Sequence, residues 1–234
     1  MLAFDIETTG LSPNECSITI VCTQDFFTNE KRSYEFARVR AEGGDVDKLA
    51  AELKADFDAA TSLCAFNGVR FDLPFMKQIG IERATIAEWI LKTSDILEQC
   101  RLRGMPTFGL NMLCEHNKVQ MKCSNGKAAI GMAERHEWSN LEVYCADDVR
   151  ILCDLYRVRF LKHPRSGVLL DLKEFAHPNV YPHEAVKEPV FAQETLEVVA
   201  GEGPTTQNDT LLTILDVCKR ILQHLQKPST CSAS

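Results

Sequence analysis

The first eleven residues, MLAFDIETTGL, constrain the fold more than any other segment. Their apolar run is typical of a buried strand, and it ends in two acids and a Thr-Gly turn. Because side chains alternate along a strand, Asp5 and Glu7 point to the face opposite Ile6. Two neighbouring carboxylates repel each other unless a cation lies between them, and hard divalent cations prefer such oxygen ligands. The pair therefore predicts either a metal site or a strand end exposed to water.

The bulk composition is that of an ordinary globular protein. With 234 residues, 45% of them hydrophobic and 25% charged, the chain can bury one sizeable core. A net charge of −7 argues against a protein that coats nucleic acid non-specifically, because such proteins carry a basic face. The net charge does not exclude an enzyme that binds only the end of a nucleic-acid strand.

The cysteines and the apolar runs bear on the cellular compartment in which the protein is expected. The ten cysteines include no Cys-x-x-Cys pair and no regular Cys/His spacing, so they predict neither a zinc site nor a disulfide framework. They are typical of small core residues in a reducing compartment. No apolar run reaches the roughly 18 residues of a membrane span, and no basic leader precedes the first strand. We expect an intracellular, soluble protein that binds no membrane.

Strands come first along the chain and then alternate with helices. Strands predicted at 2–7, 17–23 and 33–39 have short polar connections, which favour an antiparallel meander. Further strands are predicted at 62–66 and 93–97, and the order is typical of an α/β fold with a mixed sheet. Helices are expected at 45–60, 72–79, 86–91, 110–116 and 139–160.

The chain changes character beyond the predicted long helix. Prolines and acids become frequent there, so residues 166–207 are expected to form an extended arm or linker after a domain at 1–165. An amphipathic helix is predicted at 208–227, before a disordered tail at 228–234. That helix would pack on its own domain, or mediate homodimerisation or the docking of a partner protein.

A second acidic signal follows the strand predicted at 62–66. In FNGVRFDLPF, Asp72 lies at the start of a helix, after an Asn-Gly turn. As a helix cap, Asp72 would be unremarkable. Asn67 and Phe71, however, place an amide and an aromatic ring beside the same acid. They do so at the end of a strand, where α/β folds usually build sites.

The third signal lies inside the long helix. Tyr144 and Asp148 are four residues apart and therefore share a face. Asp147 lies on nearly the same face, so the spacing alone leaves open which acid belongs to a site. An apolar stripe that includes Val143 is predicted to face the core and to leave Asp148 partly buried. A buried carboxylate requires a partner, and a metal cluster supplies one.

Together the three segments resemble the exonuclease motifs of the DEDD superfamily, in its tyrosine-containing branch (DEDDy). The matching motifs are Phe-Asp5-Ile-Glu7-Thr-Thr-Gly, Asn67-x-x-x-Phe-Asp72 and Tyr144-x-x-x-Asp148. The sequence Phe-Asp-Leu-Pro-Phe is similar to the corresponding motif in the proofreading domain of family B DNA polymerases. The Tyr-Cys-x-x-Asp-Val-Arg stretch resembles stand-alone ribonuclease H-like exonucleases. The histidine branch would carry a histidine where this chain has Val143.

The resemblance implies a ribonuclease H-like α/β fold over about residues 1–160, with a mixed sheet flanked by helices. It also implies a 3′→5′ exonuclease that uses two Mg²⁺ or Mn²⁺ ions to activate a water and releases nucleoside 5′-monophosphates. Tyr144 would orient that water, since a phenol with an ordinary pKa of about 10 is a poor base at neutral pH. The metal ligands would be the four carboxylates of Asp5, Glu7, Asp72 and Asp148.

The same resemblance assigns contacts to the substrate. Thr8 and Leu11 would contact or wedge the terminal nucleotide; otherwise they are turn and core residues. Asn67 would hold the phosphate of the terminal nucleotide, and the Phe71 ring would stack on that nucleotide. The partner would be single-stranded or 3′-ended nucleic acid. DNA and RNA both remain open, because no residue can be assigned to the 2′-hydroxyl.

Two other functions fit the same residues. A structure-selective endonuclease of this fold would need the same carboxylates. A non-catalytic module that binds nucleic acid or protein would keep them as relics, although the complete set argues against this. Asp95 is either a fifth acid of the site or a helix cap. Basic residues that would rim a cleft, or remain solvated, are Arg101, Arg103, Lys118, Lys122 and Lys127.

Overall fold

The computed structural model describes residues 1–121, 127–176 and 180. The helix predicted at 208–227, the tail at 228–234 and most of the arm at 166–207 lie outside the described residues. No helix in the described part of the chain has the length and apolar character needed to cross a membrane.

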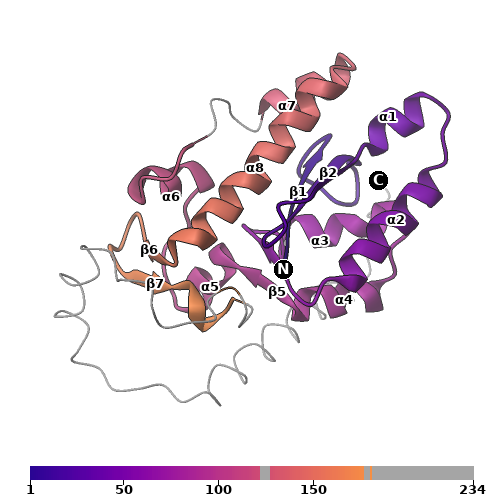
Figure 1. Ribbon diagram of the computed structural model, residues 1–234. Helices are drawn as coiled ribbons and strands as arrows, with labels where there is room; N and C mark the ends of the chain where they lie inside the picture. Colours follow the sequence, from indigo (N-terminus) through magenta and orange to yellow (C-terminus); the bar gives the residue numbers. More distant parts are fainter. Residues whose placement is uncertain (122–126, 177–179, 181–234) are drawn as a thin grey trace, which may run out of the picture.

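A five-stranded mixed sheet forms the centre of the fold, in the order β3-β2-β1-β4-β5 (Figure 1). β1 (Leu2–Thr8) pairs antiparallel with β2 (Ile18–Asp25), which pairs antiparallel with β3 (Lys31–Tyr34). On its other side β1 pairs parallel with β4 (Leu63–Ala65), and β4 pairs parallel with β5 (Thr93–Asp95). This arrangement confirms the predicted meander followed by parallel strands.

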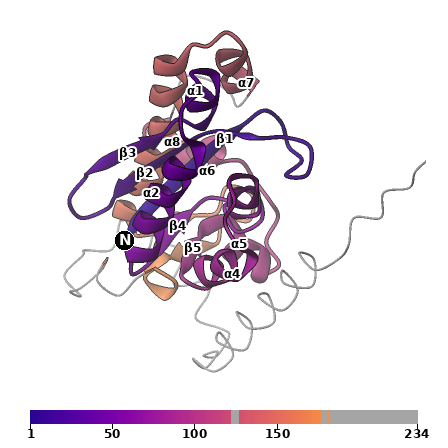
Figure 2. The ribbon, with the colours of Figure 1, turned by 90° about the vertical axis from the view of Figure 1, so that its right-hand side faces the viewer.

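Helices cover both faces of the sheet (Figures 1 and 2). The long helix α8 (Trp138–Val158) packs across β1 and β2 on one face of the sheet. Ala3 of β1 belongs to the buried cluster on this face. On the other face, Phe4 and Ile6 share a core with α2 (Val46–Ala59), α3 (Asp72–Phe75) and α4 (Arg83–Leu91). The remaining helices are α1 (Phe36–Ala41), the 3-10 turn Met76–Ile79, α5 (Ile96–Leu102), α6 (Leu110–His116) and α7 (Lys127–Glu134).

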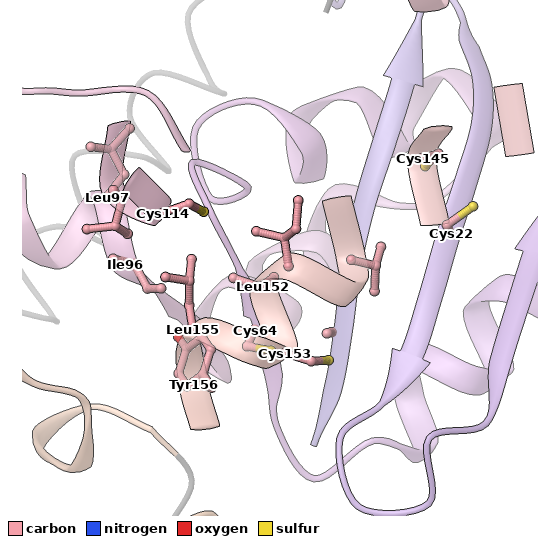
Figure 3. Packing of buried hydrophobic residues seen from close by; sticks show 14 of the residues in the cluster. Cys22, Cys64, Ile96, Leu97, Cys114, Cys145, Leu152, Cys153, Leu155 and Tyr156 are labelled. Carbon is pink, nitrogen blue, oxygen red and sulfur yellow. The ribbon is translucent and has the colours of Figure 1, made fainter. Parts of the chain in front are cut away.

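Cysteines fill the interface between the sheet and α8. Figure 3 shows Cys64 of β4 close to Cys153 of α8, and Cys22 of β2 close to Cys145 of α8. All four are buried and free. The sequence interpretation of the cysteines as core residues is confirmed for these four.

Two strands are shorter than predicted because helices replace their second halves. β3 ends at Tyr34, and α1 (Phe36–Ala41) takes up residues 36–39 of the strand predicted at 33–39. In α1, Arg38 pairs with Glu35 and Glu42, three and four residues away, and this spacing joins side chains on a helix but not on a strand. The strand predicted at 93–97 ends at Asp95, which caps α5 instead.

The apolar stripe of α8 excludes Val143, contrary to the prediction. Val143 is 69% exposed, whereas Ile151 and Leu155 are fully buried. Leu141, Tyr144 and the other buried residues of α8 define the face that meets the sheet, and the position before Tyr144 turns away from it.

A hairpin of two short strands continues the fold past the predicted boundary at 165. β6 (Phe160–Lys162) and β7 (Leu169–Asp171) pair antiparallel and lead into a 3-10 turn, Leu172–Glu174. The hairpin bend is organised by His163, whose Nδ1 accepts N–H groups of two bend residues at 3.2 and 3.0 Å. The sequence prediction did not include this hairpin, whose strands have three residues each.

Candidate metal centre

β1 and α8 bring three carboxylates together. Oxygen atoms of Asp5, Glu7 and Asp148 all lie within 4.8 Å of one another. Alternation along β1 puts the first two on the face that α8 crosses, and α8 supplies the third. Asp148 is 7% exposed, and the two β1 acids are half-buried. Negative charges at this spacing favour a cation between them, and an all-oxygen donor set suits Mg²⁺ or Mn²⁺.

Asp72 lies at the start of α3, beside this group, and is not one of the three acids whose oxygens lie within 4.8 Å of one another. It is 4% exposed, and its Oδ1 accepts the backbone N–H of Ile6, the residue between the two β1 acids, at 3.1 Å. Burial, with the nearby charges of Asp95 and Asp148, raises the pKa of Asp72 to about 8. A cation bound beside this carboxyl would favour its ionised form and lower that pKa.

The structure distinguishes the two neighbouring acids of α8. Asp147 is half-buried, and its Oδ1 accepts a hydrogen bond from Arg150 Nε at 2.8 Å. Arg150 also donates to Asp154 at 2.6 Å, so Asp147 belongs to a charged network along the helix. Asp148 instead lies with the β1 acids, one turn after the buried Tyr144. The structure thus brings Asp148, and not Asp147, into the carboxylate group.

The residues after the β1 acids form a turn with an exposed apolar tip. Thr8 Oγ1 donates to the carbonyl of Gly10 at 2.6 Å, as a turn residue would. The pairing of β1 with β2 shifts register between Glu7 and Thr8, an irregularity of the kind that re-aims side chains beside sites. Leu11 is 84% exposed, which excludes the core alternative for this residue.

Asp95 anchors the turn that carries the second motif. It is 2% exposed and accepts the N–H groups of Asn67 at 2.9 Å, Val69 at 3.0 Å and Glu98 at 3.1 Å. Burial raises the pKa of Asp95, against the opposing effect of these three donors. It is therefore the cap of α5 and the holder of the Asn67 turn, and the helix-cap alternative is confirmed.

The ends of the parallel strands explain why these segments meet. β1, β4 and β5 end at the same edge of the sheet, so the β1 acids, Asn67 and Asp95 come together from distant parts of the sequence. Phe71 lies in the same turn, half-buried, with its ring 5.0 Å from that of Phe75. Part of Phe71 is thus packed against its own helix.

The predicted basic rim is divided among several environments. Arg101 donates to Asn67, whereas Arg103 pairs with Glu174. Lys118 is exposed, as the solvated alternative predicted. The side chains of Lys122 and Lys127 lie outside the described structure.

Gly68→Ala should destabilise the protein because the turn passes close to the sheet. A Cβ at Gly68 would lie 2.5 Å from Ala65 Cβ and 3.2 Å from the Phe4 ring. We expect a loss of about 1–3 kcal/mol in the free energy of unfolding, measured by urea denaturation. Gly109→Ala, which meets nothing within 4 Å, is the control and should lose less. Equal stability of Gly68→Ala and wild type would contradict the close approach.

A family model of the RNase H superfamily matches residues 2–159. The chain belongs to the RNase H superfamily. The match includes all five strands of the central sheet, α8 and the four acids of the three motifs. The ribonuclease H-like fold that the motifs implied is thereby confirmed.

Solved structures also match. One is product-bound exonuclease I, with 16% sequence identity and a TM-score of 0.46; the match covers 77% of this chain and 44% of exonuclease I. Another is the family B DNA polymerase of Pyrobaculum calidifontis, with 16% sequence identity and a TM-score of 0.49; the match covers 67% of this chain and 24% of the polymerase. E. coli exonuclease I in complex with a dA16 oligonucleotide has 15% identity, over 77% and 42% of the two chains, with a TM-score of 0.44. This chain thus spans less than half of each. No curated protein sequence matches it.

Proposed function

We propose that the chain is a metal-dependent 3′→5′ exonuclease that hydrolyses phosphodiester bonds at the 3′ end of nucleic acid. The observation that carries this proposal is the group of three carboxylates from β1 and α8, with oxygens within 4.8 Å, inside an RNase H superfamily domain. The products would be nucleoside 5′-monophosphates. The partner would be single-stranded or 3′-ended DNA or RNA.

The four carboxylates are proposed to share one task. Asp5, Glu7 and Asp148 would hold the ions directly, and Asp72 would complete the shell from α3, where its bond to Ile6 N fixes it against β1. Two Mg²⁺ or Mn²⁺ ions bound there would supply Lewis-acid chemistry at the phosphate and acidify a water. The β1 acids are half-buried, so ions held by them would remain accessible to a substrate.

Residues outside the carboxylate group would bind the strand end. The exposed Leu11 is suited to pack against the terminal base, because a large apolar side chain at the surface gains contact area when a base covers it. Phe71 would offer the exposed part of its ring to a base, and such stacking is tolerant of sequence. Asn67 would contact the terminal phosphate.

Strands labelled at the 5′ end, with a free or a chemically blocked 3′ end, test the direction of cleavage. With Mg²⁺ or Mn²⁺ we expect the free strand to shorten stepwise from its 3′ end and the blocked strand to resist. Internal cuts in the blocked strand would instead indicate a structure-selective endonuclease. Binding without cleavage, with either ion, would indicate a non-catalytic module.

Tyr144→Phe should slow the reaction without weakening metal binding. The change removes one hydroxyl and keeps the buried ring of Tyr144 packed on the sheet side of α8. Loss of a positioning contact in the transition state costs roughly 10²–10³ in rate. Turnover and calorimetric Mn²⁺ affinity are the two measurements.

Tyr156→Phe is the matched control for that change. It removes a hydroxyl from the same helix, one that is bonded to Ser94 Oγ at 2.6 Å, and should lower stability while leaving turnover near wild type. A large loss of Mn²⁺ affinity in Tyr144→Phe would place its hydroxyl among the metal ligands. Unchanged turnover would remove Tyr144 from the mechanism.

A further inference from the structure

The side chain of Asn67 is held in one orientation by α5. Arg101 Nη2 donates to Asn67 Oδ1 at 2.7 Å. A guanidinium has five N–H donors and no acceptor, so only the oxygen end of the amide can face it. The NH₂ end of Asn67 therefore turns the other way and acts as the donating end of this side chain.

Arg101 is itself fixed by a buried acid. Glu98, 5% exposed at its side chain, accepts from Arg101 Nη1 at 3.3 Å and from Arg70 Nη2 at 2.8 Å. The Arg101 guanidinium thus lies between Glu98 and Asn67 and is only 23% exposed. Arg70 shares Glu98 but is 51% exposed and makes its described contacts with Glu98.

The backbone of Asn67 is fixed as firmly as its side chain. Asn67 has φ of +70°, a left-handed conformation that asparagine adopts more readily than most residues. Its N–H is bonded to Asp95 Oδ1, so α5 holds Asn67 at both the main chain and the amide. A single orientation of the donor NH₂ group follows from these contacts.

We propose that Arg101 is a positioning residue that sets the flip of the Asn67 amide, so that its NH₂ group donates to a phosphate oxygen of the bound strand. This rests on the proposed function. The opposite flip would present a carbonyl oxygen to an anionic phosphate, which has acceptors only. Arg101 therefore acts on substrate binding through Asn67, and not on the chemical step.

Steady-state kinetics on a single-stranded oligonucleotide with Mg²⁺ test the assignment. Arg101→Leu should raise KM about tenfold, the value of one lost hydrogen bond to a charged group, with kcat within about twofold of wild type. Arg70→Leu is the matched control, since it removes the same charge and the same kind of bond to Glu98, and should leave KM near wild type. Arg101→Lys keeps a donor and should recover part of the loss.

Asn67→Asp separates a binding role from a structural one. An aspartate would pair with Arg101 and tolerate the left-handed backbone, so the melting temperature should not fall. It has no NH₂ donor and carries a negative charge, so KM should rise more than in Asn67→Ala. A KM in Asn67→Asp equal to that of wild type would overturn the proposal, as would equal effects of Arg101→Leu and Arg70→Leu. Absence of cleavage by the wild-type protein would instead overturn the proposed function itself.

Discussion

Asp5→Ala and Asp148→Ala should each reduce turnover by at least about 10³-fold, because each would remove one of the proposed metal ligands from the carboxylate group between β1 and α8. The fold should survive both changes. Deleting one of several neighbouring negative charges relieves repulsion, so the unfolding midpoint in EDTA should stay the same or rise.

Asp154→Ala is the control for these two variants. Asp154 lies on the same helix and pairs with Arg150 and Arg157 at the surface, so its loss should leave turnover near wild type. Single-turnover rates and denaturation curves on all three proteins are the measurements. Near-normal turnover in either Asp5→Ala or Asp148→Ala would show that the two-metal interpretation is wrong.

Asp148→Asn should be far more damaging than Asp147→Asn. The first change replaces a buried carboxylate of the three-acid group with a neutral amide, and a loss similar to that of Asp148→Ala is expected. The second weakens only a half-exposed ion pair with Arg150, and such pairs contribute about 0–1 kcal/mol to stability. A side-by-side activity assay checks the ranking. The reverse order would mean that the register of α8 against β1 is wrong.

The sequence contained enough information for the parts of the site that depend on local periodicity. Alternation along β1 predicted that Asp5 and Glu7 share a face, and the structure puts them on the α8 side of the sheet. The four-residue spacing from Tyr144, together with the family pattern, favoured Asp148, and the fold then separated Asp148 from Asp147. For Asp5 and Glu7 the periodicity of one strand was enough to predict the shared face.

The remaining parts of the site depend on contacts between distant segments. Nothing local indicates that Asp95 would hold the turn at Asn67, 28 residues earlier, or that Arg101 would hold the amide of the same residue. The helix α7 was missed because Gly131 lowers its helical propensity, and its formation depends on packing against α8. The contacts of Asn67 depend on how the strand ends meet, and α7 depends on packing against α8; a sequence pattern specifies neither.

Removal and return of the metal test the central claim most directly. Turnover on one single-stranded oligonucleotide would be measured in Mg²⁺, after EDTA, and again after excess Mg²⁺. We predict that mononucleotide release stops in EDTA and recovers when Mg²⁺ is restored, in wild type but not in Asp148→Ala. Cleavage that continues unchanged in EDTA, or that Asp148→Ala retains, would contradict a metal-dependent reaction at these carboxylates.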